Sequence, residues 1–346
     1  MTTLRRLIVL CVLLMIASAA SAAERVSVTV FGLFHPRKII VESKQSLLVK
    51  AGAQQFVLEP GQRIVLTLTN GRVLVDEHIA GDRVSIAPRE GGDTDFNLAI
   101  PTKIRRSYRG DLTIVARNRE LVPIVSMELE TAVASINAAE ATPGATIEAL
   151  KAQAVAIRSY LVAAKPRHLD ADFCDTTHCQ FLKSPPPRES LAAQATEATR
   201  GLVLAWRGKP FAAMYSASCS GRTHSLAEIG YSVRDYPYFA VECDYCRRHP
   251  ERWTATVSPE DAAALASKSE SERVRLARKL GWNTVPSNDH SAKLNGTTVD
   301  LSGVGRGHGL GLCQRGAAAL AREGRGFEEI LQHYYPNTNV ESVDKK

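Results

Sequence analysis

The sequence predicts an α+β protein in which a β-rich N-terminal region precedes a mixed α+β domain. From Arg25 to about Ile124, apolar and polar residues alternate in short runs that are separated by Gly, Pro and Asn-Gly. After about Met127, apolar residues instead recur at helical spacings of three and four. The 346 residues are enough for a sizeable core and for two domains. We expect the β-rich region to span residues 24–107 and the mixed domain to span residues 108–340, before a tail at 341–346.

A short leader precedes both regions. MTTLRR is basic, LIVLCVLLMIA is an apolar run of eleven residues, and small residues follow up to Ala20-Ser21-Ala22. This order is typical of a secretory signal peptide over residues 1–22. The apolar run is shorter than the roughly 20 residues that span a bilayer, and no later segment is long and apolar enough. We therefore expect an exported protein of the periplasm or cell envelope, with no transmembrane segment after cleavage.

The net charge of the chain limits the classes of partner that it is expected to bind. The formal net charge is +7, and removal of Arg5 and Arg6 with the leader takes it to 7 − 2 = +5. A modest basic excess suits an anionic cell-wall polymer or membrane surface, or serves only solubility. Lys and Arg are scattered along the chain without a basic run interleaved with aromatic residues, so we expect no nucleic-acid partner.

The β-rich region has one strong turn signal and no catalytic cluster. LTLTNGRVLV places Asn70-Gly71 between two alternating runs, which predicts a hairpin with a type I′ turn. Further short strands are predicted in KIIVES, SLLVKA, QQFVLEP, RVSIAP and DLTIVARNRELVPIVSMEL. A scaffolding or binding role is the default for this region.

Glu140 stands where one helix is expected to end and another to begin. ELETAVASINAAE is compatible with a helix, Pro143 and Gly144 interrupt it, and Thr146 is suited to cap the next one. We expect Glu140 to be held by rigid elements and to be open to a groove. The second helix carries an apolar stripe formed by Ile147, Leu150, Ala154, Ile157 and Leu161.

Several polar residues are candidates for a binding surface. Lys151 and Arg158 are seven residues apart and share a helix face, where they meet either a ligand carboxylate or water. In the glycine-rich stretch GRGHGLG, the backbone is free to approach a ligand and His308 is placed to contact it or to orient Glu140. The stretch lacks the strand and helix context of a nucleotide-binding loop. Three further residues carry hydroxyls that are suited either to line a sugar-binding groove or to form a tight turn: Tyr215, Ser218 and Thr223.

Six cysteines remain after the leader, which carries Cys11. His168, Cys174, His178 and Cys179 lie within twelve residues, a set that suits either zinc or a Cys174–Cys179 disulfide in an exported protein. We expect a second disulfide among Cys219, Cys243 and Cys246, which otherwise complete a metal set. The remaining cysteine of the mature chain is Cys313.

Ordered motifs over roughly residues 108–338 resemble a known family. ELETAVASINAAEATPGATIEALKAQAVAIRSY, MYSASCSGRTHS and GVGRGHGLGLCQRGAAALAREGRGFEEILQHYYPNT follow one another as the corresponding segments do in the SpoIID/LytB family of cell-wall proteins. The chain departs from the family pattern in four places that bear on the groove, one of which is Ser220 in place of a Gly. Ala141-Thr142-Pro143 stands where Met-Pro follows the glutamate, Arg306 where Trp is common, and Cys313 where Ser is common.

The resemblance implies peptidoglycan chemistry. It maps the catalytic acid/base of a lytic transglycosylase onto Glu140, and a substrate-binding role onto Gln314 in the closing motif. Such an enzyme needs one carboxyl group with a raised pKa and no cofactor, because the sugar's own 6-hydroxyl attacks the anomeric carbon. Some members hold zinc through one His and two Cys, for which His168, Cys174 and Cys179 are the best match. Other relatives are amidase enhancers, so the alternative is a non-cutting peptidoglycan-binding activator of a cell-wall amidase.

Overall fold

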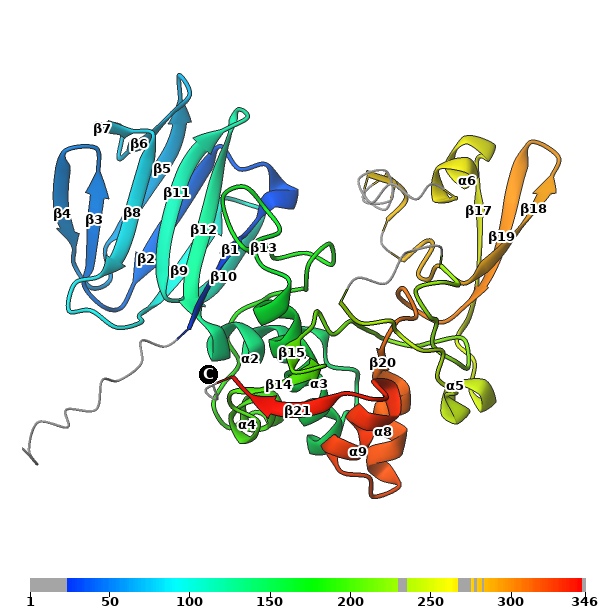
Figure 1. Ribbon diagram of the computed structural model, residues 1–346. Coiled ribbons are helices and arrows are strands. Elements are labelled where there is room, and N and C mark those ends of the chain that lie inside the picture. Colours follow the sequence, from blue (N-terminus) through cyan, green and yellow to red (C-terminus); the bar gives the residue numbers. More distant parts are fainter. Residues whose placement is uncertain (1–23, 230–234, 267–274, 277–278, 282, 344–346) are drawn as a thin grey trace, which may run out of the picture.

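The computed structural model describes residues 24–229, 235–266, 275–276, 279–281 and 283–343 (Figure 1). The expected signal peptide lies outside these residues. Within them, the protein has the predicted α+β class, with several sheets in its N-terminal part and helices in the middle and at the C-terminal end. No helix in the described ranges is long and apolar enough to cross a membrane.

Two sheets share one core in the N-terminal part. The first has the order β13-β1-β12-β11-β8-β3-β4, and the second has the order β10-β9-β2-β5-β6-β7. Alternate residues of their strands are buried, so the period-2 pattern of the sequence places one face of each sheet in that core. The strands are β1 (Arg25–Thr29), β2 (Lys38–Ser43), β3 (Leu47–Ala51), β4 (Gln54–Leu58), β5 (Arg63–Thr69), β6 (Arg72–Val75), β7 (Ile79–Gly81), β8 (Arg83–Pro88), β9 (Asp95–Ile100), β10 (Ile104–Arg109), β11 (Asp111–Arg117), β12 (Glu120–Glu128) and β13 (Phe173–Cys174).

The predicted hairpin and the end of the strand-rich part are both visible in the structure. Asn70 and Gly71 join β5 to β6 with φ values of 51° and 76°, which confirms a turn with two positive φ angles. The strands continue to Glu128, because β11 and β12 pair with each other and with β8 and β1. The expected boundary between the β-rich region and the mixed domain, between residues 107 and 108, falls inside β10. A 3₁₀ turn, η1 (Gly32–Phe34), follows β1.

Helix α3 (Ile147–Ala163) lies between two hydrophobic cores. Its Ala154 and Ile157 belong to the core of the two N-terminal sheets, whereas its Ala152 and Ala156 belong to a second core nearer the C-terminus. Helices α2 (Leu129–Glu140) and α4 (Leu191–Ala198) pack against it. Small alanine side chains around the helix allow this close packing on more than one side. Thr146 occupies the N-cap position of α3 as predicted, but its hydroxyl makes no capping hydrogen bond.

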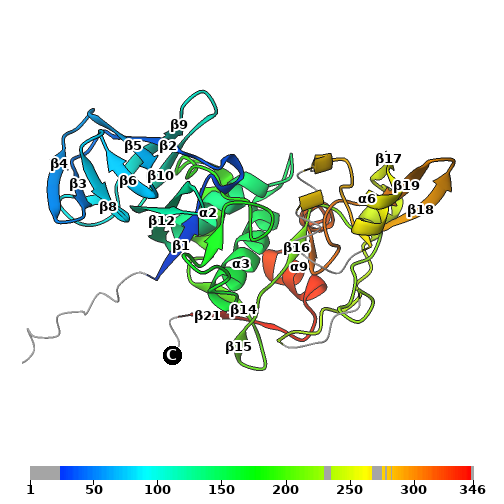
Figure 2. The ribbon, with the colours of Figure 1, turned by 90° about the horizontal axis from the view of Figure 1, so that it is seen from above.

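The C-terminal part encloses the second core. Helices α8 (Gln314–Arg322) and α9 (Phe327–Tyr334) pack against α3, and Figure 2 shows α3 and α9 close together. Strand β21 (Asn339–Ser342) pairs with β14, so regular structure runs past residue 340. The other elements are β14 (Leu202–Trp206), β15 (Lys209–Pro210), β16 (Tyr215–Ser216), α5 (Asp244–Arg248), β17 (Arg252–Val257), α6 (Pro259–Leu265), β18 (His290–Asn295), β19 (Thr298–Val304) and β20 (Leu312–Cys313).

Candidate active site

Glu140 is the last residue of α2, and its carboxylate is bound on both oxygens. Oε1 accepts a hydrogen bond from the backbone N–H of Phe181, and Oε2 accepts one from the hydroxyl of Tyr215. Its backbone carbonyl accepts a third from Gln314 Nε2 at 2.7 Å. Three segments that are far apart in the sequence therefore fix the position of one half-buried carboxyl group.

The surroundings of Glu140 favour its protonated form. Burial raises its pKa from an ordinary value near 4.5 to about 6, although the hydrogen bonds from Tyr215 and the Phe181 amide act in the opposite direction. Burial is also the main reason that the pKa of Tyr215 lies well above its usual value, so this hydroxyl stays a donor near neutral pH. A carboxyl group that titrates near pH 6 is suited to act as an acid and then as a base.

Short parallel strands bring Tyr215 and Gln314 to Glu140. Tyr215 in β16 pairs with Leu312 in β20, and Gln314 begins α8 directly after β20. Gln314 is 5% exposed. In this structure it therefore contacts Glu140 from the interior rather than lining an open surface.

Phe181 is a site residue that sequence reasoning missed. It contributes a backbone N–H from the loop that follows β13, and any residue other than proline supplies such a donor. No residue type could have marked this position. Only the path of the loop brings the amide to the carboxylate.

The glycine-rich stretch packs against the protein's own chain. A Cβ at Gly311 would lie 2.0 Å from the carbonyl oxygen of Met214, and one at Gly309 would lie 2.6 Å from Cδ2 of His224. Both glycines have positive φ angles, of 63° and 74°. The expected close approach of this backbone is thus to the 214–224 segment of the same chain.

His308 is near Tyr215 rather than bound to Glu140. Its Nδ1 accepts a hydrogen bond from the Leu310 N–H at 3.0 Å, and burial lowers its pKa to about 4, opposed by a hydrogen bond with the Tyr215 backbone. The ring is therefore neutral near pH 7. In the described part of the chain, His308 and Glu140 share Tyr215 as a neighbour but are not hydrogen-bonded to each other.

A small pocket lies beside His308. Within it, His224 Nε2 is 3.5 Å from the Asp289 carboxylate, an ion pair when the histidine is protonated. The pocket is also lined by Ser218, Ser287 and Gly307. Polar groups of both signs thus face a hollow that adjoins the glycine-rich stretch.

Two expected sugar-binding hydroxyls are engaged in internal contacts. Ser218 donates to a carboxylate oxygen of Glu251 at 2.6 Å, and Thr223 donates to the Phe239 carbonyl oxygen at 3.1 Å. Both residues are buried, with 2% and 0% of their surface exposed. Tyr215 is the member of the predicted hydroxyl group that reaches Glu140.

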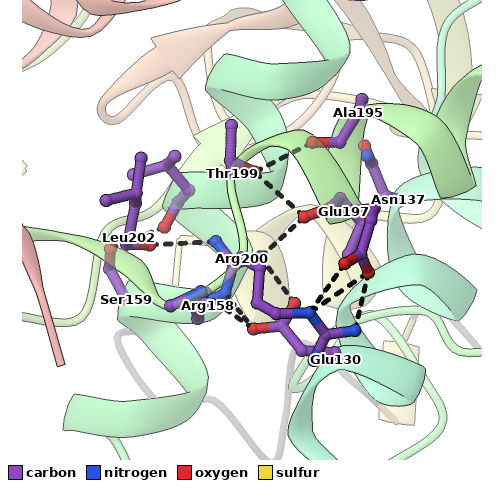
Figure 3. Close-up of polar contacts among 12 residues, drawn as sticks. Glu130, Asn137, Arg158, Ser159, Ala195, Glu197, Thr199, Arg200 and Leu202 are labelled. Atoms are coloured by element: carbon purple, nitrogen blue, oxygen red, sulfur yellow. Dashed lines mark hydrogen bonds and ion pairs between the residues drawn. The ribbon is translucent and has the colours of Figure 1, made fainter. Parts of the chain in front are cut away.

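Arg158 lies in the interior, not on the surface that the sequence suggested. Its guanidinium is fully buried and makes two hydrogen bonds to the Glu130 carboxylate, at 2.8 and 2.7 Å (Figure 3). It also donates to the carbonyl oxygens of Leu202 and Thr196. The shared helix face with Lys151 is real, but α3 is covered by other elements at Arg158. Lys151 is half-buried and pairs with Glu148 at 2.6 Å.

The His/Cys set that suits either zinc or a disulfide is assembled in the loop between α3 and α4. One ligand atom from each of His168, Cys174, His178 and Cys179 lies within 4.8 Å of the other three. His168 Nε2 is 3.2 Å from Cys179 Sγ, and His178 Nδ1 is 3.7 Å from Cys174 Sγ. Two thiols and two imidazoles fit a tetrahedral zinc ion, and His178 supplies the fourth ligand to the three expected ones. Both thiols are free, as are those of Cys219, Cys243 and Cys246, where a disulfide was expected.

Comparison with known proteins finds a family match in the middle of the chain. Residues 117–206, which include Glu140, α3 and the His/Cys cluster, match the SpoIID family, described as "Stage II sporulation protein". The match supports the resemblance to the SpoIID/LytB family over this segment of the chain. Stage II sporulation protein D of Bacillus subtilis is 26% identical over 269 residues, which cover 64% of this chain and 76% of that protein.

Two other relatives match this chain over different shares of their own length. A protein of Brachyspira hyodysenteriae that is named only as uncharacterized is 25% identical over 339 residues, covering 87% of this chain and 90% of its own length. A Bacillus subtilis protein named "Amidase enhancer" is 24% identical over 279 residues, covering 57% of this chain and 38% of that protein.

Proposed function

We propose that the chain is an exported peptidoglycan lytic transglycosylase in which Glu140 is the acid/base. The match to the SpoIID family and the similarity to a relative named "Amidase enhancer" support a role connected with the cell wall. The observation that carries the catalytic proposal is the raised pKa of Glu140, about 6, at a position fixed by Tyr215, Phe181 and Gln314. An isolated surface glutamate would have neither the pKa nor the fixed geometry.

The reaction needs only one carboxyl group. Protonated Glu140 gives its proton to the glycosidic oxygen as the bond to the anomeric carbon breaks. The resulting carboxylate then takes the proton of the 6-hydroxyl of the same sugar while that oxygen bonds to the anomeric carbon. The products are a free hydroxyl on one glycan end and a 1,6-anhydromuramyl group on the other, and no water is consumed.

Tyr215, Phe181 and Gln314 act as positioning residues in this proposal. The Tyr215 hydroxyl and the Phe181 amide stabilise the carboxylate that remains after proton donation, and Gln314 holds the end of α2. Because two of these donors approach the carboxylate oxygens directly, Glu140 is restricted to a narrow range of orientations.

We further propose that His168, Cys174, His178 and Cys179 hold a structural zinc ion. Zinc bound there supplies cross-linking of the loop and no chemistry for glycan cleavage. Phe181 follows Cys179 by two residues, so a fixed loop keeps the Phe181 amide pointed at Glu140. Substitution of Cys174 by Ser is expected to remove this zinc and to speed hydrogen exchange of the Phe181 amide, measured by NMR or mass spectrometry. Unchanged exchange after loss of the metal would contradict the role.

A wall-binding activator of an amidase is the second candidate. The relative named "Amidase enhancer" favours it, as does the occupation of both Glu140 oxygens by groups of the protein itself. In this case the chain would bind peptidoglycan and leave the glycan strands intact.

The test compares Glu140→Gln with a matched substitution at an exposed site. Glu197 in α4 pairs with Arg200 at the surface, so Glu197→Gln makes the same chemical change away from the site. The mature protein and both variants are incubated with intact and amidase-stripped peptidoglycan, and the products are analysed by mass spectrometry. We expect 1,6-anhydromuramyl ends from the native protein and Glu197→Gln, and none from Glu140→Gln. If no protein produces these ends while all three sediment with the wall, the activator role replaces the enzymatic one.

A further inference from the structure

Four cysteines outside the Glu140 site converge in the second hydrophobic core. Cys219, Cys243, Cys246 and Cys313 are at most 3% exposed, and their Sγ atoms all lie within 4.8 Å of one another. They come from three separate stretches: the segment after β16, the start of α5, and the junction of β20 with α8. The sequence indicates a group of Cys219, Cys243 and Cys246, whereas Cys313 is brought to them only by the fold.

We propose that these four cysteines form a structural zinc site, distinct from the His/Cys cluster. Tetrahedral zinc with Zn–S bonds of about 2.3 Å places its sulfurs about 3.8 Å apart. Cys246 and Cys313 Sγ are separated by 3.5 Å, close to that edge and well beyond the roughly 2.0 Å of a disulfide bond. Cys243 and Cys246 also have the Cys-x-x-Cys spacing that supplies two ligands from one turn.

Hydrogen-bond donors surround the sulfurs in the way that thiolate ligands require. Cys313 Sγ accepts from the N–H groups of Cys219 and Gly316, at 3.4 and 3.5 Å. The hydroxyl of Tyr334 lies 3.5 Å from Cys243 Sγ, where it is placed to donate. Donors of this kind orient metal ligands and spread their negative charge.

The local charges also suit an anionic centre. Zinc with four thiolates carries a net charge of 2 − 4 = −2, and its burial requires nearby positive potential. Cys313 occupies the N-cap of α8, where the helix dipole presents its positive end. The Arg315 guanidinium is close enough to interact electrostatically with Cys246. Binding releases the thiol protons to water as zinc takes their place.

The site would join three segments of the second hydrophobic core that lie near the Glu140 site. Cys219 lies in the segment that packs against the glycine-rich stretch, and Cys313 directly precedes Gln314, which holds Glu140. A zinc ion here would therefore tie the segments that carry Tyr215 and Gln314 to α5. The proposal is independent of whether the protein cleaves glycan.

The test isolates this cluster from the His/Cys cluster. The mature chain with Cys174→Ser and Cys179→Ser is purified after export, and its zinc is measured by elemental analysis and by zinc-edge X-ray absorption. We expect one zinc per chain with four sulfur neighbours. Addition of Cys313→Ser is expected to abolish that zinc.

A second measurement uses the native chain and so does not require that a variant fold correctly. The protein is denatured with a chelator under non-reducing conditions, its thiols are alkylated, and the peptides are mapped by mass spectrometry. We expect all four cysteines to be alkylated. Disulfide-linked peptides among them, the absence of zinc from the double variant, or iron in place of zinc would each overturn the proposal.

Discussion

Glu140 couples the stability of the fold to pH, because the folded protein opposes its ionisation. Its pKa is raised to about 6 from near 4.5, so its contribution to stability is full below pH 4.5 and is lost as pH rises through 6. A shift of this size corresponds to about 2 kcal/mol. We expect the free energy of unfolding of Glu140→Gln, relative to the native protein, to increase by about this amount between pH 4 and pH 8. Denaturant unfolding across that range measures it, and a difference independent of pH would contradict the assigned pKa.

Tyr215 sets the pH range in which Glu140 is protonated. Its hydroxyl hydrogen-bonds to the carboxylate and so lowers the Glu140 pKa against the effect of burial. In the proposed reaction, activity falls as pH rises through about 6, because the acid form disappears. Tyr215→Phe is expected to raise the Glu140 pKa and to move this falling limb to higher pH. A limb that stays in place while the rate drops would show that Tyr215 acts through something other than the carboxyl group.

Single residues differ in how far the sequence could place them. The position of Glu140 at a helix end followed from Pro143 and Gly144, which stop one helix before another begins. Arg158 was misjudged because a spacing of seven shows which residues share a helix face but not whether another element covers that face. Phe181 contributes through its backbone, so no side chain could have identified it.

Among the elements, one buried ion pair joins α2 to α3, and its arginine also contacts α4. Arg158 of α3 binds Glu130 of α2 (Figure 3). It also donates to the Thr196 carbonyl oxygen of α4. Loss of one partner of such a pair leaves an uncompensated charge and costs about 3–5 kcal/mol. We therefore expect Arg158→Met to destabilise the fold by about that amount in thermal or denaturant unfolding.

Lys151→Met is the matched control for this prediction. Lys151 lies on the same helix and pairs with Glu148 at a more accessible position, where an ion pair three residues apart contributes about 0.2–0.5 kcal/mol. A similar loss of stability in both variants would contradict a special structural role for Arg158.

Strands and helices were easier to predict than the loops between them. Alternation and Asn-Gly turns are local signals, so the hairpin at Asn70-Gly71 could be read directly. The glycine-rich stretch predicts a backbone that approaches a ligand closely. In the structure, its tight contacts are with Met214 and His224 of the same chain. Contacts between segments a hundred residues apart cannot be predicted from the local sequence of either segment.

At the scale of the whole molecule, the strand-rich part and the helices share a core. Ala154 and Ile157 of α3 are buried with the strand residues, and β13 pairs with β1 at the edge of the first sheet. The composition change near Met127 marked a change of secondary structure, but it could not show that the two parts pack into one another.

Removal of the strand-rich part is accordingly expected to unfold the remainder. A chain shortened to residues 129–346 would expose the face of α3 that Ala154 and Ile157 occupy and would lose the partner of β13. We expect it to lack a cooperative thermal transition by circular dichroism, in contrast to the mature protein. A cooperative, monomeric fragment would show that residues 129–346 fold independently.

The most direct test of the central claim follows the oxygen atom at the cleaved bond. The mature protein is incubated with peptidoglycan in ¹⁸O-labelled water, and the masses of the glycan fragments that carry new ends are measured by mass spectrometry. If Glu140 directs attack by the sugar's own 6-hydroxyl, the muramyl ends will lack one water and carry no ¹⁸O, and Glu140→Gln will not form them. Ends that carry ¹⁸O would show hydrolysis instead, and the absence of new ends from the native protein would contradict glycan cleavage altogether.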